Sequence, residues 1–198
     1  MAISKFLSKK IKVHHRKKFA TNKVFNLYFD AINDENNNVY EDNYLVIETH
    51  HSLDDYTGVS VLPVKDNSVL LIKIYRHAIQ KEIFEVPRGF VDNNDASIKF
   101  SALRELREET VLECRDEDII FMHGMYPEPG ILRAKIALFI AYNCFESNIN
   151  ETSGNELGHN SYKYFSRDEV GTMINEPENF DTTTFILLKQ WYQNKPKN

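Results

Sequence analysis

The sequence predicts a layered α/β or α+β domain preceded by a small strand-rich subdomain. A chain of 198 residues, of which 42% are hydrophobic, is long enough for one sizeable core. β-prone segments dominate its first half, whereas helix-forming segments alternate with strands in its second half. Strands with interspersed helices are typical of layered α/β and α+β folds.

The first half consists mainly of β-prone segments that are separated by polar turns such as residues 33–38 and 65–67. The predicted strands are 24–29, 44–49, 58–63, 68–76 and 83–86. A boundary is expected near Tyr56, between an N-terminal β subdomain of residues 21–56 and a main domain of residues 57–198.

The second half begins with a helix. Ser97 is a suitable N-cap, and residues 98–111 contain good helix formers without Gly or Pro. Beyond this helix the sequence predicts strands at 119–126, 135–142 and 162–165, a polar loop at 144–160, and helices at 167–175 and 182–193.

Charge is distributed unevenly along the chain. The net charge of −5 argues against a general polyanion binder, so nucleic acid is not the expected partner. Residues 1–20 nevertheless hold seven Lys or Arg and no acid, which leaves 17 basic against 29 acidic residues elsewhere. This segment is interpreted as a basic N-terminal extension or a first strand, with a targeting sequence or a phosphate-attracting arm as alternatives.

Other segment types are missing from the sequence. No apolar run reaches the length of a membrane span, and the residues after Met1 lack the apolar core of a secretory signal, so a cytoplasmic protein is expected. Cys114 and Cys144 show no CxxC spacing and are expected to be reduced, structural thiols.

The helix at 98–111 carries an unusual cluster of acids. At 100° per residue, Glu105, Glu108 and Glu109 fall within roughly 100° of one another, opposite an apolar face. A solvated acidic face is the simpler interpretation. However, neighbouring like charges and acids near a helix C-terminus both cost free energy, which a bound divalent cation would offset. Clustered carboxylates suit Mg²⁺, with Mn²⁺ as a substitute.

The segment from Gly89 to Leu112 resembles the Nudix box, G-x5-E-x7-R-E-U-x-E-E-x-G-U, where U is aliphatic. The matching residues are Arg104, Glu105, Leu106, Glu108, Glu109 and Leu112. Three departures stand out. The spacing from Gly89 to Arg104 is one residue too long, so Asp95 or Ala96 takes the place of the first Glu. Val111 replaces the late Gly, and Arg88 stands where a small residue is usual.

This resemblance implies an α/β/α sandwich around a mixed sheet, with an N-terminal strand subdomain that is commonly exchanged in a homodimer. Tyr75-Arg76 ahead of Glu85 looks like the strand pair of ADP-ribose and nucleotide-sugar pyrophosphatases, and Pro127 fits the Pro that accompanies ADP-ribose-type substrates. Arg133 and Ala134 depart from the acidic pair often found after that Pro.

The resemblance also implies roles for individual residues. Glu105 and Glu109 would be the main Mg²⁺ ligands, Glu108 a further ligand or water contact, and the Arg88 carbonyl a backbone ligand. Arg104 would hold the carboxylates by ion pairing. Arg76 would contact phosphate and Glu85 would contact ribose or metal-bound water, with a surface ion pair and a satisfied strand-end acid as the alternatives.

A general base is expected from the loop that contains Glu151 and Glu156, and Glu156 is favoured because it lies nearer the following strand. The alternative is a solvated loop acid. His123 and His159 are further candidates near neutral pH, although a lone His is more often structural.

The expected reaction is Mg²⁺-dependent hydrolysis of the diphosphate linkage of a small nucleoside-diphosphate derivative, such as ADP-ribose or a nucleotide sugar. Dinucleoside polyphosphates and capped RNA are alternative substrates. RNA remains an alternative because residues 1–20 are basic. A non-catalytic sensor of a nucleotide derivative is the alternative from another class.

Overall fold

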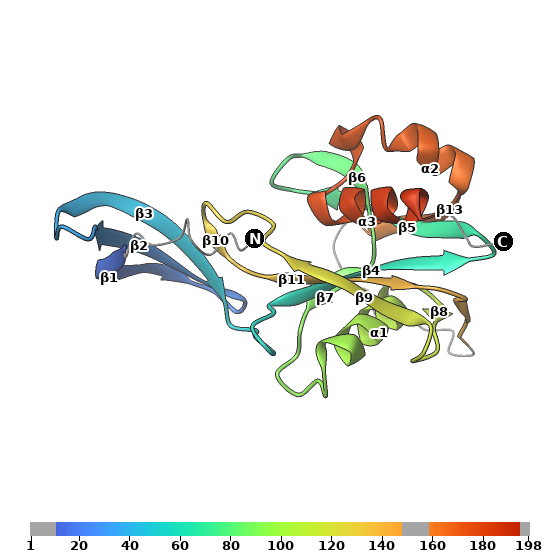
Figure 1. Ribbon diagram of the computed structural model, residues 1–198, viewed down its shortest axis with the longest axis horizontal. Helices are drawn as coiled ribbons and strands as arrows, with labels where there is room; N and C mark the ends of the chain where they lie inside the picture. Colours follow the sequence, from blue (N-terminus) through green and yellow to red (C-terminus); the bar gives the residue numbers. More distant parts are fainter. Residues whose placement is uncertain (1–10, 148–158, 195–198) are drawn as a thin grey trace, which may run out of the picture. The chain divides into compact units, whose positions relative to one another are not determined.

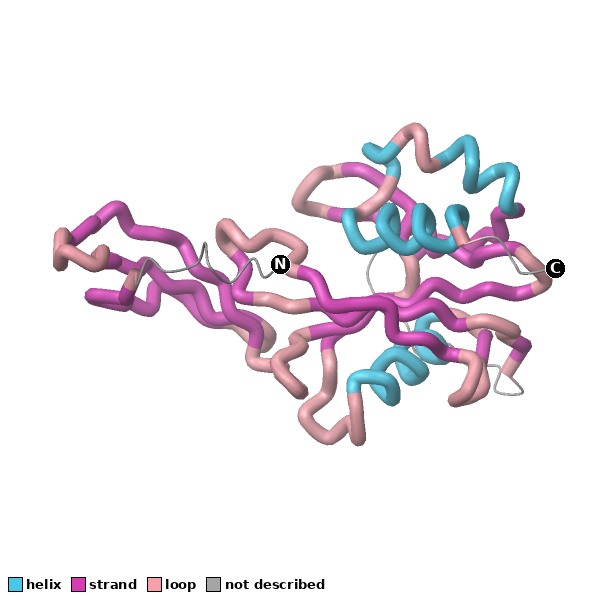
Figure 2. Tube along the Cα trace, in the orientation of Figure 1, coloured by secondary structure: helices cyan, strands magenta, loops and turns pink. Residues whose placement is uncertain are grey.

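The computed structural model describes residues 11–147 and 159–194, and the chain divides into two compact units (Figure 1 and Figure 2). The N-terminal unit comprises the chain up to His50 together with Glu128–Ala134. The main unit comprises His51–Pro127 and the chain from Lys135 onward. The segment Glu128–Ala134 was not predicted to join the N-terminal strands.

The N-terminal unit is a four-stranded sheet in the order β1-β2-β3-β10. Its strands are β1 (Lys12–Thr21), β2 (Phe25–Asn33), β3 (Val39–Thr49) and β10 (Leu132–Arg133). β1, β2 and β3 are antiparallel, whereas β10 runs parallel to β3. Residues 12–20, interpreted as a basic extension or a first strand, thus belong to β1. The sequence pattern of this strand is weak because nearly all of its side chains are exposed.

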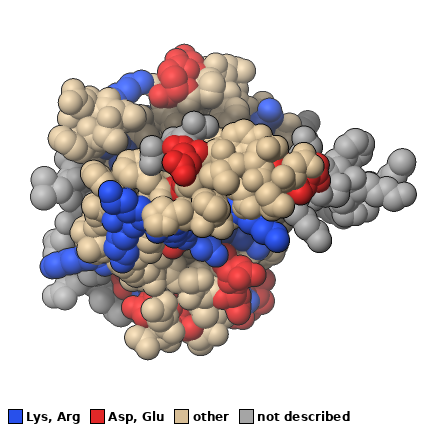
Figure 3. Space-filling view, turned by 90° about the vertical axis from the view of Figure 1, so that its left-hand side faces the viewer, with Lys and Arg blue, Asp and Glu red and all other residues tan. Residues whose placement is uncertain are grey.

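The basic residues of β1 face two environments. Arg16 is ion-paired to Asp30 and Glu48, each at 2.7 Å, and Arg133 from β10 binds Glu48 at 2.8 Å. Burial alone would raise the pKa of Glu48, but its hydrogen bonds with the two guanidinium groups lower it. The lysines of β1 remain exposed. On the face drawn in Figure 3, Lys and Arg side chains lie among Asp and Glu.

The main unit is built on a mixed sheet in the order β13-β5-β4-β11-β9, with β6 paired to β5 and β7 paired to β4. β4 and β11 run parallel, and the other pairs are antiparallel. The strands are β4 (Gly58–Lys65), β5 (Ser68–Arg76), β6 (Lys81–Glu85), β7 (Arg88–Phe90), β9 (Ile119–Met125), β11 (Ile136–Ala141) and β13 (His159–Ser166). Two short strands, β8 (Leu112–Glu113) and β12 (Phe145–Glu146), pair separately.

Helices cover both faces of this sheet. Figure 1 shows α1 (Ile98–Glu109) on one face, with α2 (Arg167–Met173) and α3 (Thr182–Gln193) on the other. Ala102 and Leu106 of α1 belong to one buried apolar cluster, and Val170 and Trp191 belong to a second. The predicted α/β/α sandwich is confirmed. β4 is buried along nearly its whole length because both of its faces are covered.

Local signals set the start of each helix. Ser97 caps α1 and Ser166 forms a capping box with Glu169 at α2, while Asp181 accepts the first amides of α3. A short 3₁₀ helix, η2 (Pro177–Asn179), precedes α3. No helix among the described residues is long and apolar enough to cross a membrane.

Candidate active site

The site is built where β7 passes under α1. β7 pairs with β4, which places Gly89 opposite Val59 and holds the strand against the helix. A Cβ atom added to Gly89 would overlap the carboxylate of Glu105. A larger residue here would therefore displace the Glu105 carboxylate, which is held by its ion pair with Arg104.

Arg104 forms ion pairs with two acids of the helix, Glu105 and Glu108. Its Nη1 atom lies 2.6 Å from Glu105 Oε1 and 3.0 Å from Glu108 Oε2. Its Nη2 atom donates to the Phe90 carbonyl at 3.0 Å, which ties the helix to the end of β7. Burial lowers the pKa of Arg104, but the neighbouring carboxylates outweigh it and raise the pKa overall. Burial raises the pKa of Glu105 above its ordinary range, against the opposing effect of Arg104.

The sequence left open whether Asp95 or Ala96 stands in the position of the motif's first Glu. In the structure, Asp95 is the one that contacts Arg104. It is buried, forms an ion pair with Arg104 at 3.1 Å, and accepts a hydrogen bond of 2.6 Å from the Ser101 hydroxyl. Burial would raise the pKa of Asp95, but these hydrogen bonds lower it. The extra residue in the loop therefore still leaves an acid beside Arg104.

Glu109 faces the backbone of Arg88. The Arg88 amide N–H donates to Glu109 Oε2 at 2.8 Å, so Arg88 contacts the acidic helix through its main chain. The metal-ligand role of its carbonyl stays a prediction. The Arg88 side chain turns elsewhere and forms an ion pair of 2.7 Å with Asp181.

Arg76 and Glu85 face one another. Arg76 Nε and Nη2 donate to the two carboxylate oxygens of Glu85 at 2.7 and 2.6 Å. Glu85 is buried and also lies 3.6 Å from Arg88, so it is shared by two guanidinium groups. The two residues are brought together as a bidentate ion pair, and their contacts with substrate stay predictions.

Asp181 was missed by the sequence reasoning. Besides Arg88, its carboxylate accepts hydrogen bonds from the Thr183 hydroxyl at 2.6 Å and the Thr184 amide at 3.0 Å. The Thr184 hydroxyl in turn accepts from the Val86 amide at 2.8 Å. Its position before a helix-forming run could have marked Asp181 as an N-cap, but its pairing with Arg88 has no local signal.

The structure does not place the other predicted residues in this network. Among the described residues, the hydrogen bonds and ion pairs around Arg104 and Arg88 do not include Pro127, which follows β9 at the end of a main-unit segment. Glu151 and Glu156 lie outside the described residues. His123 approaches Gln190 at 3.3 Å, which fits a structural role.

Residues 55–186 match the sequence model of the NUDIX domain. The chain belongs to the NUDIX family. It is accordingly a Nudix hydrolase, and the resemblance of residues 89–112 to the Nudix box is confirmed at the level of the family.

The chain is also similar to a curated protein and to a solved structure. This Nudix chain is 26% identical over 133 residues to the methanol dehydrogenase activator of Bacillus methanolicus, covering 67% of this chain and 70% of the relative. Its fold matches the crystal structure of an ADP compounds hydrolase with a TM-score of 0.72 and 16% identity, covering 93% of this chain and 95% of the other. The structural match supports the fold.

The donor set of this Nudix site fits a divalent cation in its chemistry. Within residues 11–147 and 159–194, no three acidic, His or Cys side chains converge as a ready-made metal site. Glu105 and Glu108 instead share the cationic Nη1 of Arg104. These two carboxylates already bind one positive charge, and Gly89 has no side chain that would fill the space beside Glu105. Their oxygen atoms are suitable ligands for Mg²⁺.

Proposed function

We propose that this Nudix hydrolase cleaves the diphosphate linkage of ADP-ribose or a nucleotide sugar in a Mg²⁺-dependent reaction, releasing a nucleoside monophosphate and a sugar phosphate. The supporting observation is the convergence of Glu105 and Glu108 on one atom of Arg104. Glu109 is held beside them by the Arg88 amide. Glu105 and Glu109 thus both lie against the backbone of β7.

Glu105, Glu108 and Glu109 would hold the metal, with the Arg88 carbonyl as a backbone ligand. Bound Mg²⁺ neutralises charge on the diphosphate and lowers the pKa of the attacking water. Arg104 positions the carboxylates, because it is fixed in turn by Asp95 and the Phe90 carbonyl. Glu156 is the proposed general base.

The substrate side of the site is basic. Arg76 and Arg88 have side chains that are 34% and 33% exposed, so both guanidinium groups are accessible to phosphate oxygens. Glu85 fixes the Arg76 guanidinium and Asp181 fixes the Arg88 guanidinium, each through a short ion pair. An orientated guanidinium loses less side-chain entropy on binding phosphate than a mobile one. Glu85 acts on the substrate mainly through Arg76 in this arrangement, because its own carboxylate is buried.

The decisive experiment measures turnover of ADP-ribose, nucleotide sugars, dinucleoside polyphosphates and capped RNA with Mg²⁺, with identification of the products. Glu109→Gln should reduce the turnover of the best substrate by about 100-fold or more. Glu117→Gln is the matched control, because Glu117 is an exposed acid outside the site.

Equal activity of wild type and Glu109→Gln would contradict the proposed site. Binding of a substrate without turnover would favour the sensor, and preferential cleavage of capped RNA would replace the proposed substrate class. We also propose a homodimer, which light scattering of the purified protein tests directly.

A further inference from the structure

The two cysteines of the chain flank a pair of short strands: Cys114 directly follows β8, and Cys144 directly precedes β12. β8 and β12 pair antiparallel, with Glu113 opposite Phe145 and Leu112 opposite Glu146. The same register extends to Ser147, whose amide donates to the Val111 carbonyl at 2.7 Å. Continued in the other direction by one residue, this register places Cys114 directly opposite Cys144.

Cys114 and Cys144 occupy the type of position in an antiparallel ladder at which opposite side chains lie closest together. Pairs in an antiparallel ladder alternate between hydrogen-bonded and non-hydrogen-bonded. Because Val111 and Ser147 form a hydrogen-bonded pair, Cys114 and Cys144 fall at a non-hydrogen-bonded one. The Cys144 amide agrees, since it donates away from β8 to the Val64 carbonyl at 3.0 Å. Cα atoms at such pairs are about 4.5 Å apart, within the range that a disulfide spans.

The side chains complete this arrangement. The Cys114 thiol donates to the carbonyls of Arg115 and Tyr142, each at 3.3 Å, and the Cys144 thiol donates to the Ala141 carbonyl at 3.2 Å. The neighbouring Cys114 thiol lowers the pKa of Cys144, although burial opposes it, and the pKa of Cys114 is raised. Cys144 is 5% exposed in the apolar cluster beneath α1, and Cys114 packs against the same cluster. Cys144 also lines a cavity of the main unit, whereas Cys114 does not, so Cys144 is assigned as the thiol that meets an oxidant and Cys114 as the thiol that reacts with it afterwards.

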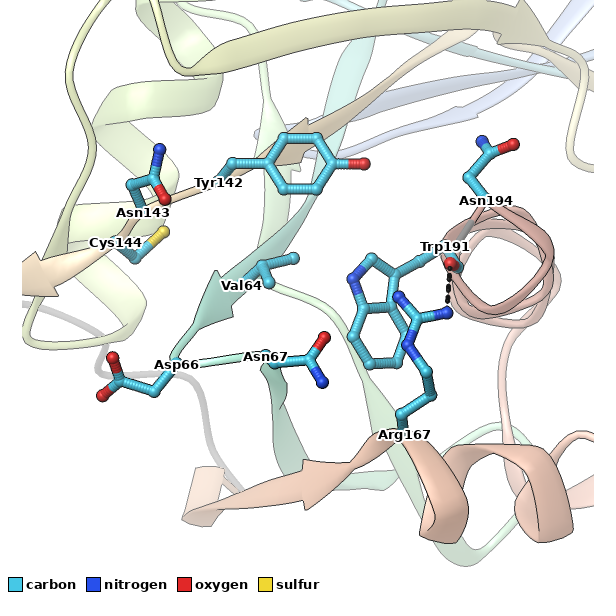
Figure 4. Close-up of a pocket in the computed structure, with 9 residues that line it drawn as sticks. All are labelled: Val64, Asp66, Asn67, Tyr142, Asn143, Cys144, Arg167, Trp191 and Asn194. Atoms are coloured by element: carbon cyan, nitrogen blue, oxygen red, sulfur yellow. Dashed lines mark hydrogen bonds between the residues drawn. The ribbon is translucent and has the colours of Figure 1, made fainter. Parts of the chain in front are cut away.

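A small molecule has a route to Cys144. Together with polar and aromatic residues, Cys144 lines a cavity of about 630 Å³ on the main unit (Figure 4). Its walls include Asn143, two residues after β11, and Arg167 and Trp191 from the helices. The Arg167 guanidinium stacks on Trp191, with 4.1 Å from Cζ to the ring centroid, and donates to the Trp191 carbonyl. The volume of the cavity is many times that of a peroxide molecule, and Cys144 forms part of its wall.

We propose that Cys114 and Cys144 are an oxidisable pair, which a peroxide converts into a cross-strand disulfide. The Cys144 thiolate attacks one peroxide oxygen, the O–O bond breaks, and Cys144 becomes a sulfenic acid as the other oxygen leaves and is protonated to water. The Cys114 sulfur then attacks the Cys144 sulfur, the S–O bond breaks, and the hydroxyl leaves as water with the Cys114 proton. Two thiols are oxidised and one peroxide is reduced to two waters.

The disulfide would act on the segment that follows the acidic helix. Cys114 lies shortly after Glu109, and Cys144 follows β11 in the centre of the sheet. The bond would close a loop of about 30 residues, which restricts the unfolded chain. A rise in melting temperature on the order of 5–10 °C is expected for the oxidised protein.

The test treats the full chain with hydrogen peroxide, followed by intact-mass analysis, non-reducing peptide mapping and thermal melting. Wild type should lose about 2 Da, yield a linked Cys114–Cys144 peptide pair, and melt at a higher temperature until a reductant is added. Cys114→Ser should instead accumulate a sulfenic acid at Cys144 that a dimedone-type probe captures. Cys144→Ser should remain unmodified at the same dose.

Two results would overturn the proposal: addition of oxygen without the 2 Da loss, or a disulfide between two copies of the chain. A linked Cys114–Cys144 peptide supports the pairing even if the melting temperature is unchanged. The peptide map of wild type decides the pairing even if a serine variant fails to fold. None of these measurements requires a substrate, so they are independent of the proposed hydrolysis.

Discussion

Gly89 is the residue at which the backbone and the acidic helix compete for space. Gly89→Ala would drive a methyl group into the Glu105 carboxylate, so the helix or the carboxylate must shift. We expect turnover to fall by about 100-fold, because displacements of about 1 Å at an active site have effects of that size. Steady-state kinetics on the best substrate measure this loss.

The matched control is Gly130→Ala, where the added methyl group would meet only the end of the Glu128 side chain. This variant should keep wild-type turnover. A Gly89→Ala enzyme of normal activity would show that Glu105 need not stay where the structure places it.

Arg104 acts at the same scale through charge and shape. Its guanidinium reaches Asp95, Glu105 and Glu108 together, which a lysine ammonium cannot reproduce. Arg104→Lys should therefore raise the Mg²⁺ concentration required for half-maximal activity by about 10-fold, the usual effect of losing a group that orients metal ligands. Arg107→Lys, on the exposed side of the same helix, should leave that concentration unchanged. If both variants raise the Mg²⁺ concentration for half-maximal activity equally, the effect comes from the helix as a whole and not from the contacts of Arg104.

The residues of the site were predictable to different degrees. Helical geometry alone places Glu105, Glu108 and Glu109 on one face, and the structure adds that Arg104 connects two of them. The Arg76–Glu85 pair joins neighbouring strands, so the two residues could be expected to lie close together. Arg88 and Asp181 are 93 positions apart, and only the packing of α3 over the sheet brings them together.

At the scale of elements, Asp181 serves both α3 and the site. As the N-cap it accepts two amides of α3, and it holds the Arg88 side chain. Asp181→Asn should destabilise the protein by about 1–2 kcal/mol at pH 7, because it weakens the N-cap and removes the ion pair with Arg88. The Asp181 side chain is only 15% exposed, so water screens this ion pair weakly. Urea unfolding measures this difference.

The effect should depend on pH. Burial alone would raise the pKa of Asp181, but Arg88 and the threonine hydrogen bonds lower it below its ordinary 3.8. A carboxylate with a lowered folded-state pKa stabilises the protein above its ordinary value and loses that contribution as the pH falls through the folded value. The difference between wild type and Asp181→Asn should therefore shrink below pH 3.8. Ser97→Ala removes an uncharged cap from α1 and should cost a similar amount at every pH.

Elements with strong internal patterns were predicted best. The helix at 98–111 was expected from its cap and composition and ends at Glu109, two residues early, because the backbone of Thr110 is extended, with φ −136° and ψ 164°. β4 and β11 carry the apolar runs of strands buried on both faces. The short strands β7 and β10 have no periodicity of their own and exist through their partners, so sequence patterns could not reveal them.

At the scale of the whole molecule, the division into units depends on contacts that are distant in sequence. Glu128–Ala134 joins the N-terminal unit through Leu132 and Arg133, which pair with Ile47 and Glu48 of β3. The Ile47 amide also bonds to the Ile131 carbonyl at 2.8 Å. A composition-based boundary near Tyr56 cannot include such a segment, because it recognises only breaks along the chain.

The charge of β1 is the remaining whole-molecule feature that bears on the substrate. Lys12, Lys17 and Lys18 are exposed, while the strand itself is held by backbone pairing with β2. Replacing all three by Gln should thus remove positive charge and keep the sheet. Because the proposed substrate is a small diphosphate bound at Arg76 and Arg88, its kcat/KM should stay within about twofold of wild type, with an unchanged salt dependence. A loss of tenfold or more on capped RNA, with ADP-ribose hydrolysis preserved, would show that β1 binds a polyanion and that RNA is a substrate. Deleting the strand would not separate these outcomes, because it would also expose the edge of β2.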